Sequence, residues 1–295
     1  MDRIRPHGRR RAPPPDPDQS RSAPPAHRRS PVADDDAANG VREVKSAART
    51  VELLEVLSQL DSPATLRTLA ERMGVPRSSL YALLQTLVGR GWVRTDPTGS
   101  LYAIGIRALL AGTGYIDADP RTAMVGPHLD ALSERLGETV HFARLDGPDV
   151  VYLATRESRH YLRPFSRVGR RLPAHSTSLG KALLAERTDA EVDALLPDPL
   201  PAVTAGTLTD RPALFAELAR IRERGYSTDD GENVVGLRCI GVALRYDRPA
   251  VDALSCSLPA ARYTPEVADT AIGALLEVRA TLERGASTSF GAFRG

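Results

Sequence analysis

The chain has 295 residues and a net charge of +2, and this length allows two ordinary domains. Its two cysteines, Cys239 and Cys256, are too few for a disulfide framework, and no apolar run approaches the ~20 residues that a membrane span needs. These observations argue against a small disulfide-stabilised domain and against an integral membrane helix. They favour a cytoplasmic protein with reduced thiols.

Residues 1–42 predict a disordered tail rich in Pro and Arg. Up to residue 41 the chain has eight Pro, eight Arg and six Asp, with almost no large apolar residue. Because no apolar segment follows the first basic residues, a secretory signal is not expected. The clusters Arg9-Arg10-Arg11 and Arg28-Arg29 either contact DNA phosphates or are simply solvated.

The sequence predicts a winged helix-turn-helix DNA-binding domain over residues 43–104. A first helix is expected from about Val44 to Leu60, and two short amphipathic helices follow it around a tight turn. Ala70, Gly74 and Leu80 fall where a helix-turn-helix needs a small crossing residue, a turn residue tolerant of positive φ and an apolar anchor.

A hairpin pattern after these helices completes the predicted wing. Gly91–Arg94 predicts one strand, Asp96–Gly99 its turn and Leu101–Ile104 the return strand. In such a domain the start of the second helix of the motif stays exposed and enters the major groove. Residues 1–110 carry a net charge of +5 and the remainder −3, which suits a DNA-facing module joined to a second domain.

The rest of the chain indicates a linker helix over residues 105–120, an α+β domain over residues 121–287 and a short tail over residues 288–295. The linker helix carries an apolar stripe through Leu109 and Leu110. This stripe packs either against a second copy of the chain, which would make a homodimer, or against the second domain.

The second domain is expected to hold a mostly antiparallel sheet with helices packed on it, because strand clusters and helical runs do not alternate as βαβ units. The expected strands are Thr139–Leu145, Val150–Thr155, Tyr161–Phe165, Val235–Tyr246 and Val251–Leu258. One expected helix ends near Gly137, and another begins after Ser176. Two more are expected over Ala213–Arg224 and Pro265–Arg284.

One segment of this domain, His175–Lys181, opens a helix with hydroxyl residues at capping positions. The N–H groups there either seat a carboxylate or are capped by Ser176 or Thr177. A P-loop is excluded because His175 stands where its first Gly is required, and a nucleophile elbow is excluded because Ser176 occupies the place of a Gly. The histidines lack metal-ligand spacing and no carboxylates pair for acid–base chemistry, so neither a cofactor nor enzyme activity is expected.

Several segments in this order and spacing resemble the isocitrate lyase regulator (IclR) family of bacterial transcription factors. They are VKSAARTVELLEVL, LAERMGVPRSSLYALLQTL, RLPAHSTSLGKALLA, DDGENVVGLRC, GLRCIGVAL and ALSCSLP. The resemblance covers about residues 43–285. It implies an α+β protein with an N-terminal winged helix-turn-helix, a linker helix and a GAF-like effector domain with a curved, mostly antiparallel sheet.

The resemblance also implies a set of DNA contacts on the winged helix. The family often has a basic residue right after the aromatic residue of its recognition helix, whereas here Ala82 follows Tyr81. Arg, Gln and hydroxyl side chains nearby are therefore the expected readers of bases and phosphates. The expected DNA-binding residues are Arg49, Arg67, Pro76, Arg77, Ser78, Ser79, Tyr81, Gln85, Thr98 and Ser100.

In the second domain the family pattern implies a pocket for a small effector. Backbone N–H groups near Ser178 and Leu179 are expected to hold an anionic head, with neutral polar contacts and apolar walls around the ligand. The expected effector-binding residues are Leu172, Ser178, Leu179, Asp229, Leu237, Cys239, Ser255 and Ser257.

These features predict a ligand-responsive transcriptional regulator, a repressor or an activator of a catabolic operon, that senses a small organic or aromatic acid. Its expected partners are double-stranded operator DNA, a small-molecule effector that is a carboxylate, and a second copy of the chain in a homodimer or a dimer of dimers. The alternative is a small-molecule sensor or an enzyme whose winged helix mediates protein contacts. Salt dependence distinguishes the two, because operator binding weakens steeply as phosphate contacts release counterions.

Overall fold

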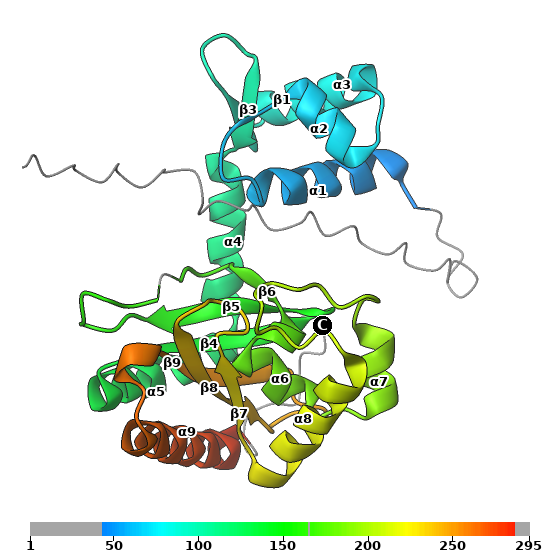
Figure 1. Cartoon of the computed structure of the whole chain (residues 1–295). Coiled ribbons are helices and arrows are strands. Elements are labelled where there is room, and N and C mark those ends of the chain that lie inside the picture. The colour runs from blue at the N-terminus through cyan, green and yellow to red at the C-terminus, as the bar shows by residue number, and fades with distance from the viewer. Residues whose placement is uncertain (1–42, 165, 287–295) are drawn as a thin grey trace, which may run out of the picture. The chain divides into compact units, whose positions relative to one another are not determined.

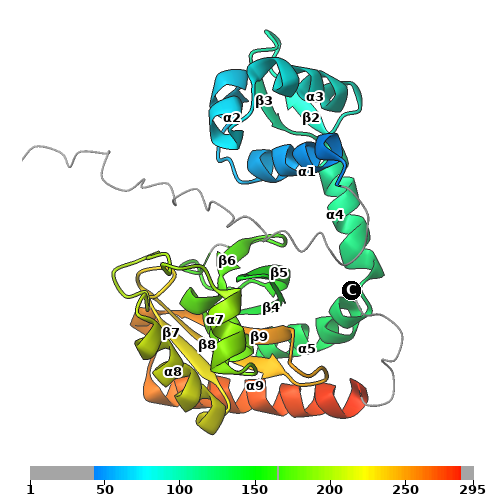
Figure 2. The same cartoon turned by 90° about the vertical axis from the view of Figure 1, so that its right-hand side faces the viewer.

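The computed structural model describes residues 43–164 and 166–286. The tails expected at residues 1–42 and 288–295 lie outside these residues. Its elements are drawn in Figure 1 and, from a second side, in Figure 2. None of the helices within the described residues is long and apolar enough to cross a membrane.

The first part of the chain folds as a winged helix. Its elements are α1 (Lys45–Ser58), β1 (Ala64–Thr65), α2 (Leu66–Met73), α3 (Arg77–Gly89), β2 (Val93–Thr95) and β3 (Leu101–Ile104). The three strands form an antiparallel sheet in the order β1-β3-β2. The periodic leucines of all three helices make its core: Leu53, Leu69, Leu80 and Leu84 have no exposed surface. The helix-turn-helix and wing predicted from the sequence are therefore confirmed.

The turn between α2 and α3 is set by local chemistry. The Thr65 side chain caps α2 by accepting a hydrogen bond from the Thr68 N–H at 3.2 Å. Gly74 ends α2 with a φ of 65°, the left-handed conformation that the sequence required of it. Pro76 then precedes α3 in an extended conformation, which its ring favours at a helix start.

The wing tip is held by a single carboxylate. Asp96 accepts hydrogen bonds from the N–H groups of Ser100 and Leu101, both at 2.8 Å, and from the hydroxyl of Thr98. The hydrogen bonds, that of Thr98 foremost, lower the pKa of Asp96 to about 2. The turn is therefore closed by an ionised Asp at neutral pH.

Helix α4 (Ile106–Ala118) begins against the base of the wing. The Gly105 N–H donates to the Trp92 carbonyl at 2.7 Å, and the Arg107 N–H donates to the Gly91 carbonyl at 3.4 Å. A Cβ on Gly105 would lie 2.8 Å from the carbonyl carbon of Trp92 and still closer to the Gly91 oxygen. Only glycine allows this approach, so the start of α4 is fixed to the wing by a backbone contact.

The second part of the chain is built on a six-stranded sheet. Its strands are β4 (Thr139–Asp146), β5 (Asp149–Arg156), β6 (Arg171–Pro173), β7 (Ser227–Asp230), β8 (Leu237–Leu244) and β9 (Asp252–Pro259). Their order is β6-β5-β4-β9-β8-β7, and every neighbouring pair is antiparallel. The sheet is curved, as Figures 1 and 2 show. The α+β architecture and the antiparallel sheet predicted from the sequence are confirmed.

Helices cover both faces of this sheet (Figure 2). They are α5 (Pro120–Leu136), α6 (Ser178–Leu184), α7 (Asp189–Leu195), α8 (Arg211–Arg224) and α9 (Pro265–Ala286). Helices α5 and α9 pack on one face with the buried apolar side chains of β4, β8 and β9. Helices α6, α7 and α8 form a second cluster on the other face. Two short 3-10 turns, Ala174–Ser176 and Ala260–Arg262, link strands to helices.

One expected strand is wrong. The strand expected over Tyr161–Phe165 is not formed: residues 161–164 are irregular, and the Tyr161 side chain is fully exposed instead of packing on the sheet. The strand that pairs with β5 is instead β6, whose three residues, Arg171, Leu172 and Pro173, are too few to show an alternating pattern. Helix α7 and strand β7 were also missed, because both are short and rich in Asp, which is typical of turns.

We predict that Gly105→Ala destabilises the winged helix by about 2 kcal/mol or more, because the added methyl group overlaps the backbone at Gly91 and Trp92. Trp92 is the single tryptophan of the chain, so its fluorescence in a urea titration reports this domain. Gly112→Ala is the matched control: it lies in α4 with no atom within 4 Å, and it is expected to be neutral or stabilising. Equal midpoints for both variants would contradict the prediction.

Candidate DNA-binding face and ligand pocket

The start of α3 presents polar side chains to solvent. Arg77, Ser78 and Gln85 are exposed, Ser79 is half-buried, and the Tyr81 ring is half-exposed. The apolar residues of α3 at Leu80, Leu84 and Leu87 point the other way into the core. Helix α3 therefore has one face for packing and one face that is open to a partner.

Other residues predicted to contact DNA lie on neighbouring elements. Arg67 on α2 is exposed and forms a 3.8 Å ion pair with Glu71 one turn away, an arrangement that contributes little to stability. Arg49 on α1 is half-buried. At the wing, Thr98 and Ser100 are exposed, but their hydroxyls hydrogen-bond to each other at 2.7 Å and to Asp96. The backbone N–H groups of both residues also donate to Asp96, so the conformation of the wing tip is fixed by this carboxylate.

The second domain contains a cavity of about 450 Å³ over the sheet face that carries α6. Its floor is a polar row that crosses four strands. In register, Asp229 on β7 faces Cys239 on β8, and Cys239 faces Ser257 on β9. Two residues along, Ser255 on β9 faces His141 on β4. These side chains alternate with the apolar ones on the opposite face, so one sheet presents a hydrophobic side and a polar side.

Close contact between α6 and the sheet closes one wall of the cavity. A Cβ on Gly241 would lie 2.7 Å from the carbonyl carbon of Ser178, so β8 has a glycine where the helix start crosses it. The Ser227 hydroxyl donates to the Ser178 carbonyl at 2.5 Å. Thr177 caps α6 by accepting from the Gly180 N–H at 3.0 Å.

Asp229 is the buried carboxyl group of the cavity. It accepts a hydrogen bond from the Glu232 N–H at 2.7 Å and is 4% exposed. Burial raises the pKa of Asp229 to about 7, an effect that the backbone hydrogen bonds and Lys181 only partly offset. Burial and the Asp229 charge also raise the pKa of the Cys239 thiol, which accepts a hydrogen bond from the Ser257 hydroxyl at 3.1 Å. Cys239 is therefore a neutral thiol.

The opposite end of the polar row is cationic. His141 contacts Thr155 through Nδ1 at 3.0 Å and the Tyr152 ring edge-on, with ring centroids 5.0 Å apart. Burial, with the nearby charge of Arg170, lowers the pKa of His141 to about 3, so the imidazole is neutral. Arg170 is held beside Tyr152, whose N–H donates to the Arg170 carbonyl at 2.9 Å. A second cavity arginine, Arg163, forms an ion pair with Glu157 at 3.0 Å.

A loop over residues 231–236 covers the cavity beside β7. It is closed by the Gly231 N–H, which donates to the Leu237 carbonyl at 2.8 Å. Beneath it the buried Lys181 ammonium pairs with Glu232, and the Thr207 hydroxyl donates to the Glu232 carbonyl at 2.6 Å. The Asn233 amide donates to Ser176 at 3.0 Å. The DDGENVVGLRC segment thus encodes an anchored loop over the pocket.

The structure brings together most of the residues that the sequence predicted for the effector. The side chains that line the cavity are those of Leu172, Ser178, Asp229, Leu237, Cys239, Ser255 and Ser257. Leu179 does not line it and packs into the α6–α8 cluster with 1% exposure. Sequence reasoning missed His141, Tyr152, Arg170 and Asn233. Arg170 lies two residues before Leu172, a spacing that places both side chains on the same side of an extended chain. This spacing could have indicated that Arg170 also lines the cavity.

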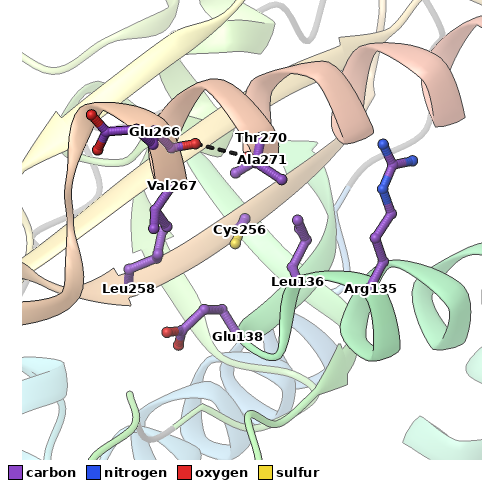
Figure 3. A pocket seen from close by; sticks show the side chains of 9 residues that line it. All are labelled: Arg135, Leu136, Glu138, Cys256, Leu258, Glu266, Val267, Thr270 and Ala271. Atoms are coloured by element: carbon purple, nitrogen blue, oxygen red, sulfur yellow. Dashed lines mark hydrogen bonds between the residues drawn. The ribbon is translucent and has the colours of Figure 1, made fainter.

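A smaller cavity of about 220 Å³ lies on the opposite side of the sheet, between α5, β9 and α9. Figure 3 shows Cys256 and Leu136 within it, and the charged ends of Glu138 and Arg135 at opposite sides. Both charges have partners: Glu138 pairs with Arg262 at 2.6 Å, and Arg135 pairs with Glu277 at 2.7 Å. This cavity therefore offers apolar walls, the paired charges of Arg135 and Glu138, and the carboxylate of Glu266. Within the described residues no cluster of His, Cys, Asp and Glu has the makings of a metal site.

Comparison with known proteins identifies both parts of the chain. Residues 46–97 match the model of the IclR helix-turn-helix domain, and residues 114–283 match that of the bacterial transcriptional regulator IclR C-terminal domain. The chain belongs to the IclR family of bacterial transcriptional regulators. The IclR resemblance of the sequence motifs is confirmed, and membership of this family makes the protein a DNA-binding regulator and not an enzyme.

Individual IclR relatives cover most of the chain. The transcriptional repressor IclR of Escherichia coli K12 is 34% identical over 228 residues, which are 76% of this chain and 83% of the relative. The acetate operon repressor of Salmonella typhimurium is 34% identical over 239 residues, 79% of this chain and 86% of the relative. An IclR homologue from Microbacterium hydrocarbonoxydans, solved in complex with 4-hydroxybenzoate, has a TM-score of 0.64 and 26% identity and covers 81% of this chain and 99% of its own.

We predict that Asp229→Asn removes a pH dependence of stability. Burial raises the pKa of Asp229 in the folded protein to about 7, above its ordinary value of 3.8. Between these two pH values the folded protein therefore holds a proton that the unfolded chain has released. The stability contributed by Asp229 is therefore present at low pH and lost, by ~1.4 kcal/mol per pH unit, as the pH rises from about 4 to 7.

The measurement is urea unfolding of wild type and Asp229→Asn between pH 5 and 8. The difference between them reports Asp229 together with its electrostatic coupling to Glu232, Lys181 and Cys239. The matched control is Asp230→Asn, next along β7, where the carboxylate is exposed and paired with Arg238 at 2.7 Å. A difference that stays constant with pH for Asp229→Asn would contradict the assignment.

Proposed function

We propose that this protein is an effector-responsive regulator of a catabolic operon, which binds its operator through α3 and senses a small organic or aromatic acid in the cavity over the polar row. The observation that carries the proposal is the charge pattern of that cavity. A neutral His141 and the cation Arg170 lie at one end, and Asp229, whose pKa burial raises to about 7, lies at the other. The domains of the proposal are residues 43–104 for DNA, 105–120 for the linker and 121–287 for the effector.

The proposed DNA contacts follow from exposure and chemistry. Arg77 and Gln85 are exposed on the open face of α3, where Arg suits guanine or phosphate and Gln suits adenine. Pro76, Ser78, Ser79 and Tyr81 surround them at the helix start. Arg49, Arg67, Thr98 and Ser100 lie outside α3 and are assigned to the phosphate backbone, which positions a protein without reading sequence.

A homodimer is proposed from the surface of α4. This helix has no buried residue within the described chain, although it carries large apolar side chains. They are Ile106, Leu109, Leu110 and Tyr115, each more than half exposed. An exposed apolar stripe on one helix is stabilised by a second copy of itself. Two copies would bind a pseudo-palindromic operator, with half-sites about one helical turn apart or a multiple of it.

The proposed effector is matched to the size and charge of the cavity. A volume of about 450 Å³ falls within the range of small-molecule sites, ~300–1,000 Å³. Arg170 supplies a cation for a carboxylate, while Leu172, Leu237 and Tyr152 supply apolar walls. Asp229, Cys239 and Ser257 offer hydrogen bonds to a hydroxyl group. The 4-hydroxybenzoate bound to the Microbacterium homologue has this combination of groups, and it is the probe we select.

Arg77→Ala is expected to weaken operator binding by about tenfold or more, because one Arg contact to a base or phosphate contributes ~1–3 kcal/mol. The measurement is a gel-shift titration at fixed salt on the DNA upstream of the gene that encodes the protein. The matched control, Arg159→Ala, removes the same charge from an exposed position of the second domain and is expected to bind as wild type does. Unchanged affinity of Arg77→Ala would refute the assigned contact.

Arg170→Gln is expected to weaken binding of 4-hydroxybenzoate by about tenfold or more, because a hydrogen-bonded ion pair is lost. Binding of the uncharged 4-hydroxybenzyl alcohol should not change. Isothermal titration calorimetry measures both, with the exposed Arg167→Gln of the same segment as the control. If wild type binds the acid and the alcohol equally, or binds neither, the proposed effector class is wrong.

A further inference from the structure

A buried charged cluster surrounds Asp252, at the first residue of β9. Asp252 has no exposed surface. Its carboxylate accepts hydrogen bonds from Arg144 Nε at 2.6 Å and Nη2 at 3.0 Å, and from the Tyr246 hydroxyl at 2.6 Å. Arg121 adds a longer contact at 3.3 Å. The two-point contact fixes the orientation of the Arg144 guanidinium on the sheet.

The terminal guanidinium nitrogens of Arg144, Nη1 and Nη2, contact the junction between α4 and α5. Nη1 donates to the Tyr115 hydroxyl at 2.8 Å and to Asp119 Oδ1 at 3.2 Å. Asp119 also caps α5, because its Oδ2 accepts from the Thr122 N–H at 3.0 Å. One arginine side chain on β4 is therefore bonded to β9, to the last turns of α4 and to the residue that starts α5.

The same two strands carry the polar row of the ligand cavity. His141 lies three residues before Arg144 on β4, and Ser255 lies three residues after Asp252 on β9. His141 faces Ser255 in the antiparallel register of these strands, just as Arg144 faces Asp252. Three residues of strand span about 10 Å. A change in the spacing of β4 and β9 at the cavity therefore acts on the strand pair that holds Arg144.

Helix α4 is also fixed at its other end, through the backbone hydrogen bonds of Gly105 and Arg107 to the base of the wing. Both ends of α4 thus have specific contacts, one to the winged helix and one to Arg144. Because a helix transmits displacement along its axis, a change at Tyr115 is carried to the wing.

We propose that Arg144 is the positioning residue that couples the ligand cavity to the linker helix, with Tyr115 and Asp119 as the contacts through which it holds α4. This inference deepens the proposed function and rests on it, since it assigns the route by which an occupied cavity alters the winged helix. Arg144 itself does not line the ligand cavity.

The first experiment measures amide hydrogen exchange in the full-length protein without ligand or DNA. Tyr115→Phe removes one acceptor of Arg144 from a half-exposed side chain, and Asp119→Asn keeps an oxygen for the α5 cap while removing the charge. Each variant is expected to accelerate exchange over residues 106–118 by about three- to tenfold, with β4 and β9 unchanged. Tyr161→Phe, a fully exposed tyrosine, is the matched control.

The second experiment tests the route from the cavity. Ser255→Val enlarges a buried side chain between β9 and β4 and is expected to change exchange over residues 106–118 in the wild-type background. The same substitution in the background of the Tyr115→Phe/Asp119→Asn double variant should leave that segment unaltered, because the hydrogen bond of Arg144 to Tyr115 and its ion pair with Asp119 are then both removed. An equal effect in both backgrounds, or loss of protection in β4 and β9 with either contact variant, overturns the proposal. Neither readout depends on 4-hydroxybenzoate, so failure of that probe to bind is a separate result.

Discussion

A carboxylate without exposed surface has to be neutralised where it lies, and Asp252 imposes this condition on the second domain. Removing one partner from such a buried ion pair leaves an uncompensated charge at a cost of several kcal/mol. The partners of Asp252 come from α5, from β4 and from the chain just after β8. A β4 strand shifted by one residue would point Arg144 to the opposite face. Asp252 therefore specifies both the strand register and the position at which the chain enters α5. Apolar contacts alone are less specific, because they tolerate small shifts in position.

The sheet of this domain separates two tasks by alternation. Positions such as Ile240, Val242 and Leu254 pack under α5 and α9 and have no exposed surface. Their neighbours Cys239, Ser255 and Ser257 point to the other face, where a cavity replaces close packing. Polar side chains at a sheet centre are costly unless they are hydrogen-bonded, and here the Ser257 hydroxyl donates to the Cys239 sulfur. Burial of the hydrophobic face stabilises the fold enough to tolerate polar side chains on the face that lines the cavity.

The sequence predicted those features that rest on local chemistry. The 3.6-residue periodicity around Leu69 and Leu84, the left-handed Gly74 and the Asp96 turn each depend on near neighbours in the chain, and each is present in the fold. The strands β4, β5, β8 and β9 were also found, because apolar alternation persists over several residues in each. The prediction of a strand around Tyr161 was wrong. Its residues have the composition of a strand, but no neighbouring strand pairs with residues 161–164.

Features that depend on residues far apart in the chain were not accessible in the same way. His141, Arg170 and Asp229 meet in one cavity only because β4, the segment before β6, and β7 are brought together by the sheet order. Arg144 and Asp252 are likewise 108 residues apart. The resemblance to IclR supplied most of the residues that line the cavity, but it did not indicate the cationic end. The Leu179 side chain packs in the core, so only its backbone N–H remains available for the predicted contact with an anionic head.

The alternation of the sheet has a consequence for how this family diversifies. Under the proposed function, substitutions at Cys239, Ser255 or Ser257 would change what the cavity recognises, while the packed side chains at the intervening positions stay as they are. Recognition could then be retuned by single changes on the polar face without loss of the packing on the hydrophobic face. One scaffold could in this way serve regulators for different metabolites.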